Sequence, residues 1–186
     1  MRVVVAMTGC SGIIYGVRLL ETLKQVDGII TYLIISDTAK KILKLETQYS
    51  LEDLRKISYA IFSEDDMMAP LASSSFNIDA MVIVPCSLKT LSALAYGLSQ
   101  NLIVRCADNV LRTRKKLVLV PRETPLSDIH LINMLKLFRR GAIILPAMPA
   151  FYHNPRTIAD LIDFVVGKIL DALNIRLNVY TKWGII

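Results

Sequence analysis

Short apolar runs alternate regularly with longer segments of helical spacing along the whole chain. Five runs have the length and β-branched content of buried strands: 2–7, 29–35, 80–85, 116–121 and 142–146. Strands that are covered on both faces read as continuous apolar runs, and parallel strands need crossover connections. The alternation therefore predicts an α/β fold, a Rossmann-like (flavodoxin-like) three-layer sandwich with a parallel sheet.

The intervening segments are predicted to be helices. The expected ranges are 12–26, 37–45, 51–57, 88–96, 102–111, 128–139 and 158–173. Ser50 with Asp53, and Thr157 with Asp160, have the spacing of capping boxes at two helix starts. Residues 63–77 have no clear periodicity and predict a surface loop near a ligand.

The chain has 186 residues and no linker-like stretch, so we expect one domain over residues 1–186. Its hydrophobic content of 53% is high, yet no apolar run reaches the roughly 18 residues of a membrane span. The surplus of apolar surface predicts contacts between subunits. The apolar run before Thr8 is too short for a secretory signal, and we expect a cytoplasmic protein without membrane contact.

The formal net charge is +6, and the basic residues gather mainly between Arg105 and Lys116. No aromatic side chains interleave them, so small phosphorylated ligands are favoured over nucleic acid. The three cysteines, Cys10, Cys86 and Cys106, form no C-x-x-C pair and have no neighbouring histidine cluster. We therefore expect neither disulfides nor a metal site.

The first predicted strand runs through the glycine-flanked turn Thr8-Gly9-Cys10-Ser11-Gly12 into a helix. A helix start presents unpaired N–H groups and partial positive charge, so this turn could hold a phosphate or another polar group. Thr8, the loop backbone and the Ser11 hydroxyl would contribute. The alternative is an ordinary turn in which Ser11 caps the helix.

Hydroxyl groups, prolines and cations collect at the predicted carboxyl ends of the strands, where open parallel sheets bind ligands. The segments are 8–11, 36–38, 85–90, 121–125 and 146–153. The full dinucleotide pattern G-x-G-x-x-G is missing, and Ser36 follows the second strand where an acidic residue would hold a ribose. Nicotinamide binding is therefore the weaker interpretation.

Several ordered motifs over nearly the whole chain resemble the flavin prenyltransferases. This UbiX/Pad1 family belongs to the homo-oligomeric flavin-containing decarboxylase-like superfamily. The matching stretches include Met7-Thr8-Gly9-Cys10-Ser11-Gly12, Leu45-Glu46-Thr47, Val84-Pro85-Cys86-Ser87, Arg105-Cys106-Ala107-Asp108, Leu119-Val120-Pro121-Arg122-Glu123-Thr124-Pro125-Leu126, Pro149-Ala150-Phe151-Tyr152-His153 and Trp183-Gly184.

The resemblance implies that dimethylallyl monophosphate alkylates reduced FMN, and that a UbiD-type decarboxylase receives the prenylated FMN. It also implies a homo-oligomer, expected to be a dodecamer with ligand sites shared between subunits. By position, the implied FMN contacts are Gly9, Cys10, Ser11, Ser36, Ser87, Leu88, Lys89, Thr90 and Arg122. The implied donor contacts are Tyr152 and Lys168, with Arg105, Arg112 and Trp183 as further candidates.

The expected chemistry fits these residue types. Cleavage of the allylic C–O bond leaves an anionic phosphate, which cations stabilise, and an allyl cation, which aromatic faces tolerate. For the flavin proton, Glu46 is the preferred acceptor, with Ser11 at the flavin edge and Glu123 as an alternative. Glu46 could instead be merely solvated and Glu123 could be paired with Arg122. Tyr152 and Trp183 could be core or interface aromatics, and both histidines are expected to be structural.

Two positions depart from the family pattern. Arg112 stands where lysine is frequent and Lys168 where arginine is frequent, so charge is retained but bidentate geometry is not. Two other functions remain open. One is an FMN-dependent cysteine-conjugate decarboxylase, although the presence of Lys89 argues against it, and the other is a non-catalytic FMN carrier.

Overall fold

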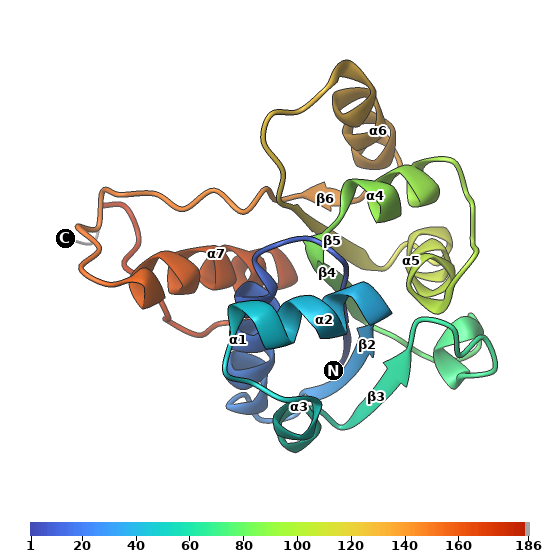
Figure 1. Cartoon of the computed structure of the whole chain (residues 1–186), viewed down its shortest axis with the longest axis horizontal. Helices are drawn as coiled ribbons and strands as arrows, with labels where there is room; N and C mark the ends of the chain where they lie inside the picture. Colours follow the sequence, from blue (N-terminus) through green and yellow to red (C-terminus); the bar gives the residue numbers. More distant parts are fainter. Residues whose placement is uncertain (185–186) are drawn as a thin grey trace.

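The computed structural model describes residues 1–184 and contains one sheet of six parallel strands (Figure 1). Their spatial order is β3-β2-β1-β4-β5-β6. The strands are β1 (Arg2–Met7), β2 (Ile30–Ile35), β3 (Ala60–Ser63), β4 (Ala80–Cys86), β5 (Lys116–Pro121) and β6 (Ile143–Ile144). The order reverses between β1 and β4, and this is the topological switch point where doubly wound sheets bind ligands.

Helices cover both faces of the sheet, which confirms the predicted three-layer architecture. On one face lie α1 (Ile13–Lys24), α2 (Asp37–Glu46), α3 (Leu51–Ile57) and α7 (Ile158–Leu173). On the other face lie α4 (Leu88–Ala95), α5 (Leu102–Arg112) and α6 (Asp128–Arg139).

The alternation of side chains along β1 explains the two-sided core. Val3, Val5 and Met7 are fully buried in one hydrophobic cluster, whereas Val4 and Ala6 are fully buried in the other. Successive side chains of a strand point to opposite faces, so a continuous apolar run supplies both layers. A central strand in a three-layer sandwich needs this pattern.

The structure differs from the prediction at the edges of the sheet. β3 was not predicted, because its four residues are only half-buried and give a weak signal. β6 has two residues where five were expected. The predicted loop 63–77 contains a short 3-10 helix, η1 (Pro70–Ala72), and Leu71 within it is fully buried. This segment therefore packs into the layer of α5 instead of lying only on the surface.

Gly16 explains how closely α1 approaches the sheet. A Cβ atom at this position would lie 2.6 Å from the carbonyl oxygen of Val84 in β4. Only glycine permits this contact, which places the start of α1 directly over the switch point. Within residues 1–184, no helix is long and apolar enough to cross a membrane.

Candidate functional site

The ends of β1 and β4 are tied together by the buried hydroxyl of Thr8. Its Oγ1 donates a hydrogen bond to the Pro85 carbonyl at 2.7 Å and accepts one from the Ser87 amide, also at 2.7 Å. This contact fixes the relative position of the two strand-end loops. The sequence singled out Thr8 as a polar group of the first loop, but its bridging role depends on a contact 77 residues away.

The anion at the start of α1 is a carboxylate of the chain itself. Glu46, the last residue of α2, accepts hydrogen bonds through Oε2 from the amides of Gly12 (2.9 Å) and Ile13 (3.2 Å). Gly12 is the N-cap residue, with a φ of 96°, and no side chain of the first loop caps the helix. The alternative with Ser11 as the cap was therefore wrong, and these two amides are engaged by Glu46.

Arg122, after β5, reaches back over the first loop. Its Nε donates to the Ser11 carbonyl at 3.1 Å. Glu123 instead accepts from the amide of Thr124 at 3.1 Å, and the described residues contain no ion pair between Arg122 and Glu123. The suggested pairing of these two side chains is therefore not present.

A cavity of about 220 Å³ adjoins Arg122 at the carboxyl ends of β5 and β6. Its lining combines apolar and polar groups: Pro121, Arg122, Glu123, Thr124, Leu126, Met134, Pro146, Ala147 and Met148. A mostly apolar cavity with a few polar groups is the usual form of a site for a small molecule or cofactor.

Cys10 is a neutral thiol at physiological pH. Burial raises its pKa to about 11, although the nearby Arg122 guanidinium acts in the opposite direction. A thiol of this kind is a poor nucleophile. The structure thus favours Cys10 as a backbone contributor to the first loop.

Ser36 and Ser87 occupy helix N-caps at the same edge of the sheet. Ser36 Oγ accepts from the Ala39 amide at 3.1 Å, and Ser87 Oγ accepts from the Thr90 amide at 3.3 Å. Leu88, Lys89 and Thr90 form the first turn of α4. The starts of α2 and α4 therefore point their partial positive charge toward the edge that carries Gly9 and Arg122.

The three donor candidates Tyr152, Lys168 and Trp183 form a second group. Figure 1 shows the segment after β6 running outward to the N-terminal end of α7, where the end of the described chain also lies. The Tyr152 and Trp183 rings meet edge to face with centroids 5.1 Å apart. Trp183 is 75% exposed, whereas Tyr152 is partly buried and packs against the hydrophobic core, so this contact lies at the rim of the core.

Lys168 projects from α7 among aromatic rings. Its Nζ lies 5.1 Å from the ring centroid of Tyr180 and 5.5 Å from that of Phe164. Within residues 1–184, no carboxylate lies at ion-pair distance from this ammonium. A half-buried cation of this kind is suited to bind an external anion.

Phe164 and Tyr180, the two aromatic residues beside Lys168, were not predicted from the sequence. Phe164 packs against the rings of Tyr152 (5.9 Å), Tyr180 (5.3 Å) and His153. The His153 ring is stacked on Phe164 at 5.5 Å, and its two nitrogens are buried without a hydrogen-bond partner in the described chain. The i, i+4 spacing of Phe164 and Lys168 was the available signal.

Arg105 and Arg112 lie in the other layer of the molecule. Arg105 Nε donates to the Ala72 carbonyl at 3.2 Å, and Arg112 bonds to Asp108 and Asn109 of its own helix. Both project from α5, so the sheet separates them from Lys168 within one copy of the chain. One copy therefore does not bring all the donor candidates together.

Loops of this kind at the switch point of an all-parallel, doubly wound sheet form a ligand site of an α/β protein. The family model described as Flavoprotein matches residues 1–170, so the chain is an α/β flavoprotein. The flavin prenyltransferase UbiX of Methanocaldococcus jannaschii is 50% identical over 184 residues, which cover 99% of each chain. The chain belongs to the UbiX family of flavin prenyltransferases.

Two solved structures are very similar to this one. The first is a UbiX protein, PadA1, in complex with FMN and dimethylallyl pyrophosphate, with a TM-score of 0.96 and 44% identity over 98% of this chain and 97% of the other. The second is a dodecameric, FMN-dependent UbiX-like decarboxylase from Escherichia coli O157:H7. It has a TM-score of 0.96 and 42% identity over 98% and 99% of the two chains.

Proposed function

We propose that this protein transfers a dimethylallyl group from dimethylallyl monophosphate to reduced FMN. The observation that carries the proposal is the Lys168 ammonium, which lies beside the rings of Phe164 and Tyr180 without a carboxylate partner in the described chain. A phosphate monoester with an apolar tail needs such a cation next to aromatic faces. Membership of the flavin prenyltransferase family supports the same reaction.

The strand-end loops suit a flavin. Reduced FMN supplies the nucleophilic ring atoms, and the chain supplies amides of the first loop, the starts of α2 and α4, and Arg122. Gly9 keeps this loop tight, since a Cβ there would lie 2.6 Å from Thr38 Cγ2. The cavity beside Arg122 adds an apolar wall. The individual contacts assigned to Gly9, Cys10, Ser11, Ser36, Ser87, Leu88, Lys89, Thr90 and Arg122 are part of the proposal.

Lys168 neutralises the phosphate as the allylic C–O bond breaks. A positioned cation stabilises charge that develops in the transition state. Tyr152 and Trp183 present aromatic faces at the same corner, where they shield the developing allyl cation from water. Arg105 and Arg112 would add positive charge only from a neighbouring copy.

Glu46 is the proposed acceptor of the proton that leaves the flavin. The amides of Gly12 and Ile13 hold its Oε2, which orients the carboxylate beside Ser11 and leaves Oε1 without a partner among the described residues. Glu123 is the second candidate for proton acceptor, because it follows Arg122 directly and lies at the same edge of the sheet. Proton transfer by a positioned carboxylate typically contributes about 10² to 10⁴ in rate.

Assembly completes the site in this proposal. The sheet separates Lys168 from Arg105 and Arg112 within one copy. We therefore infer a homo-oligomer in which neighbouring copies share donor sites. We expect it to be a dodecamer, as is the E. coli relative. The whole chain acts as one domain. We also infer that a UbiD-type decarboxylase takes up the product and that the protein works in the cytoplasm.

The proposal is tested by incubating the protein anaerobically with reduced FMN and dimethylallyl monophosphate, followed by mass spectrometry of the extracted flavin. We expect the flavin to gain one five-carbon unit. Unchanged flavin that stays tightly bound would indicate a carrier instead. Release of carbon dioxide from a cysteine conjugate, without modified flavin, would indicate a decarboxylase.

A further inference from the structure

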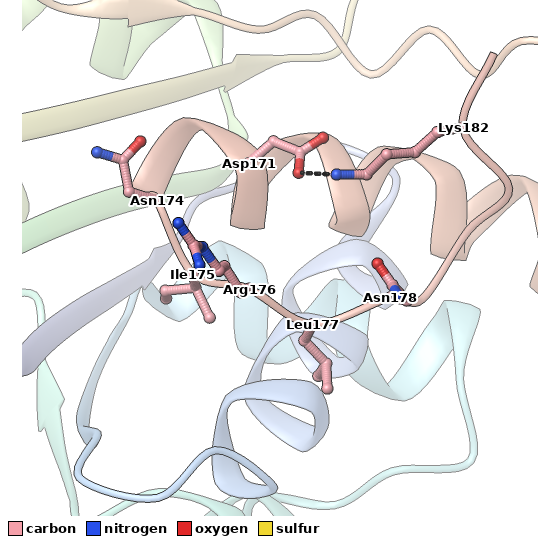
Figure 2. A pocket seen from close by; sticks show the side chains of 7 residues that line it. All are labelled: Asp171, Asn174, Ile175, Arg176, Leu177, Asn178 and Lys182. Atoms are coloured by element: carbon pink, nitrogen blue, oxygen red, sulfur yellow. Dashed lines mark hydrogen bonds and ion pairs between the residues drawn. The ribbon is translucent and has the colours of Figure 1, made fainter. Parts of the chain in front are cut away.

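The segment after α7 forms a strap that runs back along this helix. We define the C-terminal strap as residues 175–184. Figure 2 shows its first residues passing beneath the end of α7 and Lys182 reaching back to Asp171. A cavity of about 610 Å³ lies between the two, lined by Asp171, Asn174, Ile175, Arg176, Leu177, Asn178 and Lys182.

This cavity lies away from the flavin loops. Ala172, next to its lining residue Asp171, accepts a hydrogen bond through its carbonyl from Lys116 Nζ at 3.2 Å, and Lys116 is the first residue of β5. The cavity is therefore at the edge of the sheet opposite to the strand ends that carry Arg122. The strap must return along α7 to place Trp183 beside Tyr152.

One stripe of α7 receives the strap. Phe164, Gly167, Lys168 and Asp171 are spaced i, i+3, i+4 and i+7, so they share one face of the helix. Along this face, the ring of Phe164 is followed by Gly167, which has no side chain and leaves a gap. The Lys168 cation and the Asp171 anion come next. The arrangement is more specific than an apolar stripe that merely faces a core.

Tyr180 fills the gap. A Cβ atom at Gly167 would lie 2.0 Å from Tyr180 Cδ1 and 2.6 Å from Cε1, so the ring lies directly on the helix backbone. Glycine in the middle of a helix is less favourable than alanine, because it loses more backbone entropy on folding. The close approach of the Tyr180 ring explains why glycine, and not a larger residue, stands at position 167.

The strap is fastened to both oxygens of Asp171. Tyr180 donates its hydroxyl proton to Oδ2 at 2.6 Å, and Lys182 Nζ reaches Oδ1 at 3.2 Å. Lys168 lies three residues before Asp171 on the same face and would be the natural ion-pair partner of this carboxylate. Instead, Lys168 lies beside the Tyr180 ring, and Asp171 is engaged by the strap.

We propose that Tyr180 is a positioning residue that keeps the Lys168 ammonium free for the phosphate of the prenyl donor. Its hydroxyl occupies Asp171, and its ring supports Lys168. The same fastening orders the strap, so that Trp183, three residues later, lies against Tyr152. This inference rests on the proposed function, because it assigns the donor phosphate to Lys168.

The first test is the variant Tyr180→Phe, which keeps the ring on Gly167 but frees one oxygen of Asp171. Lys168 can then pair with Asp171. We expect the donor KM to rise about tenfold, which corresponds to about 1.4 kcal/mol, while kcat and the Kd for reduced FMN stay within about twofold. Tyr59→Phe, at an exposed tyrosine away from the strap, is the matched control and should leave all three values unchanged.

The second test is a double-mutant cycle between Gly167→Ala and Tyr180→Ala. Each single variant should raise the donor KM, because the first pushes the ring away and the second removes it. With the ring already absent, Gly167→Ala should add nothing, so the two effects should not be additive. Additive effects would overturn the inference, since they would show that Gly167 acts independently of the ring.

Trp183 provides a readout that does not depend on catalysis, because it is the only tryptophan of the chain. In both Gly167→Ala and Tyr180→Ala, its fluorescence anisotropy should fall and acrylamide quenching should rise, with Tyr59→Phe as the control. Circular dichroism of each variant should retain the native spectrum. Wild-type anisotropy together with a wild-type donor KM in these variants would overturn the inference. Failure of prenyl transfer in the unaltered protein, with the anisotropy changes present, would instead refute only the proposed function.

Discussion

Glu46 combines two properties that can be separated by mutation. Its Oε2 caps α1 through the amides of Gly12 and Ile13, and its negative charge makes it a proton acceptor. A glutamine side chain has an amide oxygen that can still accept both hydrogen bonds, but it carries no charge. The structural and chemical roles of this residue therefore respond differently to different substitutions.

We predict that Glu46→Gln retains FMN affinity and thermal stability but lowers the rate of prenyl transfer about 100-fold, because the proton acceptor is lost. Glu46→Ala should show the same loss of rate and should also lower the free energy of unfolding by about 1 kcal/mol, as loss of a helix cap does. Product formation under anaerobic conditions and chemical denaturation measure these effects. Full activity of Glu46→Gln would remove Glu46 from the mechanism.

Cys10 should be unreactive in the folded protein. Because burial raises its pKa from 9.0 to about 11, the thiolate fraction near neutral pH falls roughly 100-fold. Burial also raises the pKa of Cys86, and that of Cys106 to about 12. We expect iodoacetamide at about pH 8 to label the native chain roughly 100-fold more slowly than the denatured chain. Rapid labelling of Cys10 in the native protein would contradict this assignment.

Among the helices, the positions of the ends could be predicted best, because the capping residues that mark them lie close together in the sequence. The capping boxes at α3 and α7 are present as predicted from Ser50 with Asp53 and Thr157 with Asp160. Their helices also begin and end as expected. At the start of α6, the Ser127 amide donates a hydrogen bond to His130 Nδ1 at 3.1 Å. This contact was not predicted, because histidine is not a usual partner in a capping box.

The capping box of α3 should contribute to the pH dependence of stability. Hydrogen bonds from Ser50, chiefly its side chain, lower the pKa of Asp53 from 3.8 to about 2. A carboxyl group with a lowered pKa in the folded state stabilises it above the unfolded value and loses this effect as the pH falls through the folded value. The contribution is thus complete above about pH 5 and lost near about pH 2.

We therefore predict that Asp53→Asn lowers the midpoint of urea unfolding by a constant amount between about pH 5 and about pH 7. The difference from the unaltered protein should shrink as the pH falls from about 4 to about 2. Asp65→Asn, outside the box, is the control. A difference that persisted at about pH 2 would show that Asp53 acts through something other than its charge.

Long-range contacts set the limit of what the sequence could predict. The alternation of apolar runs was sufficient for the parallel sheet and its helical layers, and the family motifs were sufficient for the residues near the strand ends. Nothing local indicated that Glu46 caps α1, or that Tyr180 lies on Gly167, because each contact joins two separate elements. The separation of Arg112 from Lys168 likewise follows from topology and not from spacing.

Across the described part of the molecule, α6 carries a group of exposed large hydrophobic residues that no other element covers. Its exposed large hydrophobic residues are Ile129, Leu131, Ile132, Leu135 and Phe138, with Phe138 64% exposed. A contiguous apolar patch of this kind marks a contact surface. It accounts for the hydrophobic surplus noted in the composition, and it fits the proposed assembly.

We predict that Leu135→Lys disrupts the oligomer, because a buried unpaired charge at an interface costs several kcal/mol. Multi-angle light scattering at micromolar concentration should give a lower mass than for the unaltered protein. Prenyl transfer should fall with it, since in the proposed assembly Arg105 and Arg112 of a neighbouring copy add positive charge to the donor site. Met68→Lys, at an exposed residue outside α6, should leave the mass unchanged. An unaltered mass for Leu135→Lys would exclude α6 from the interface.

In the proposed reaction, one site joins reduced FMN to the dimethylallyl group while cations take up the departing phosphate. Its most direct test follows phosphate release and flavin mass in the same anaerobic reaction. We predict one inorganic phosphate for every flavin that gains a five-carbon unit, at equal rates. Phosphate release without modified flavin, or no release at all with both compounds bound, would contradict the claim.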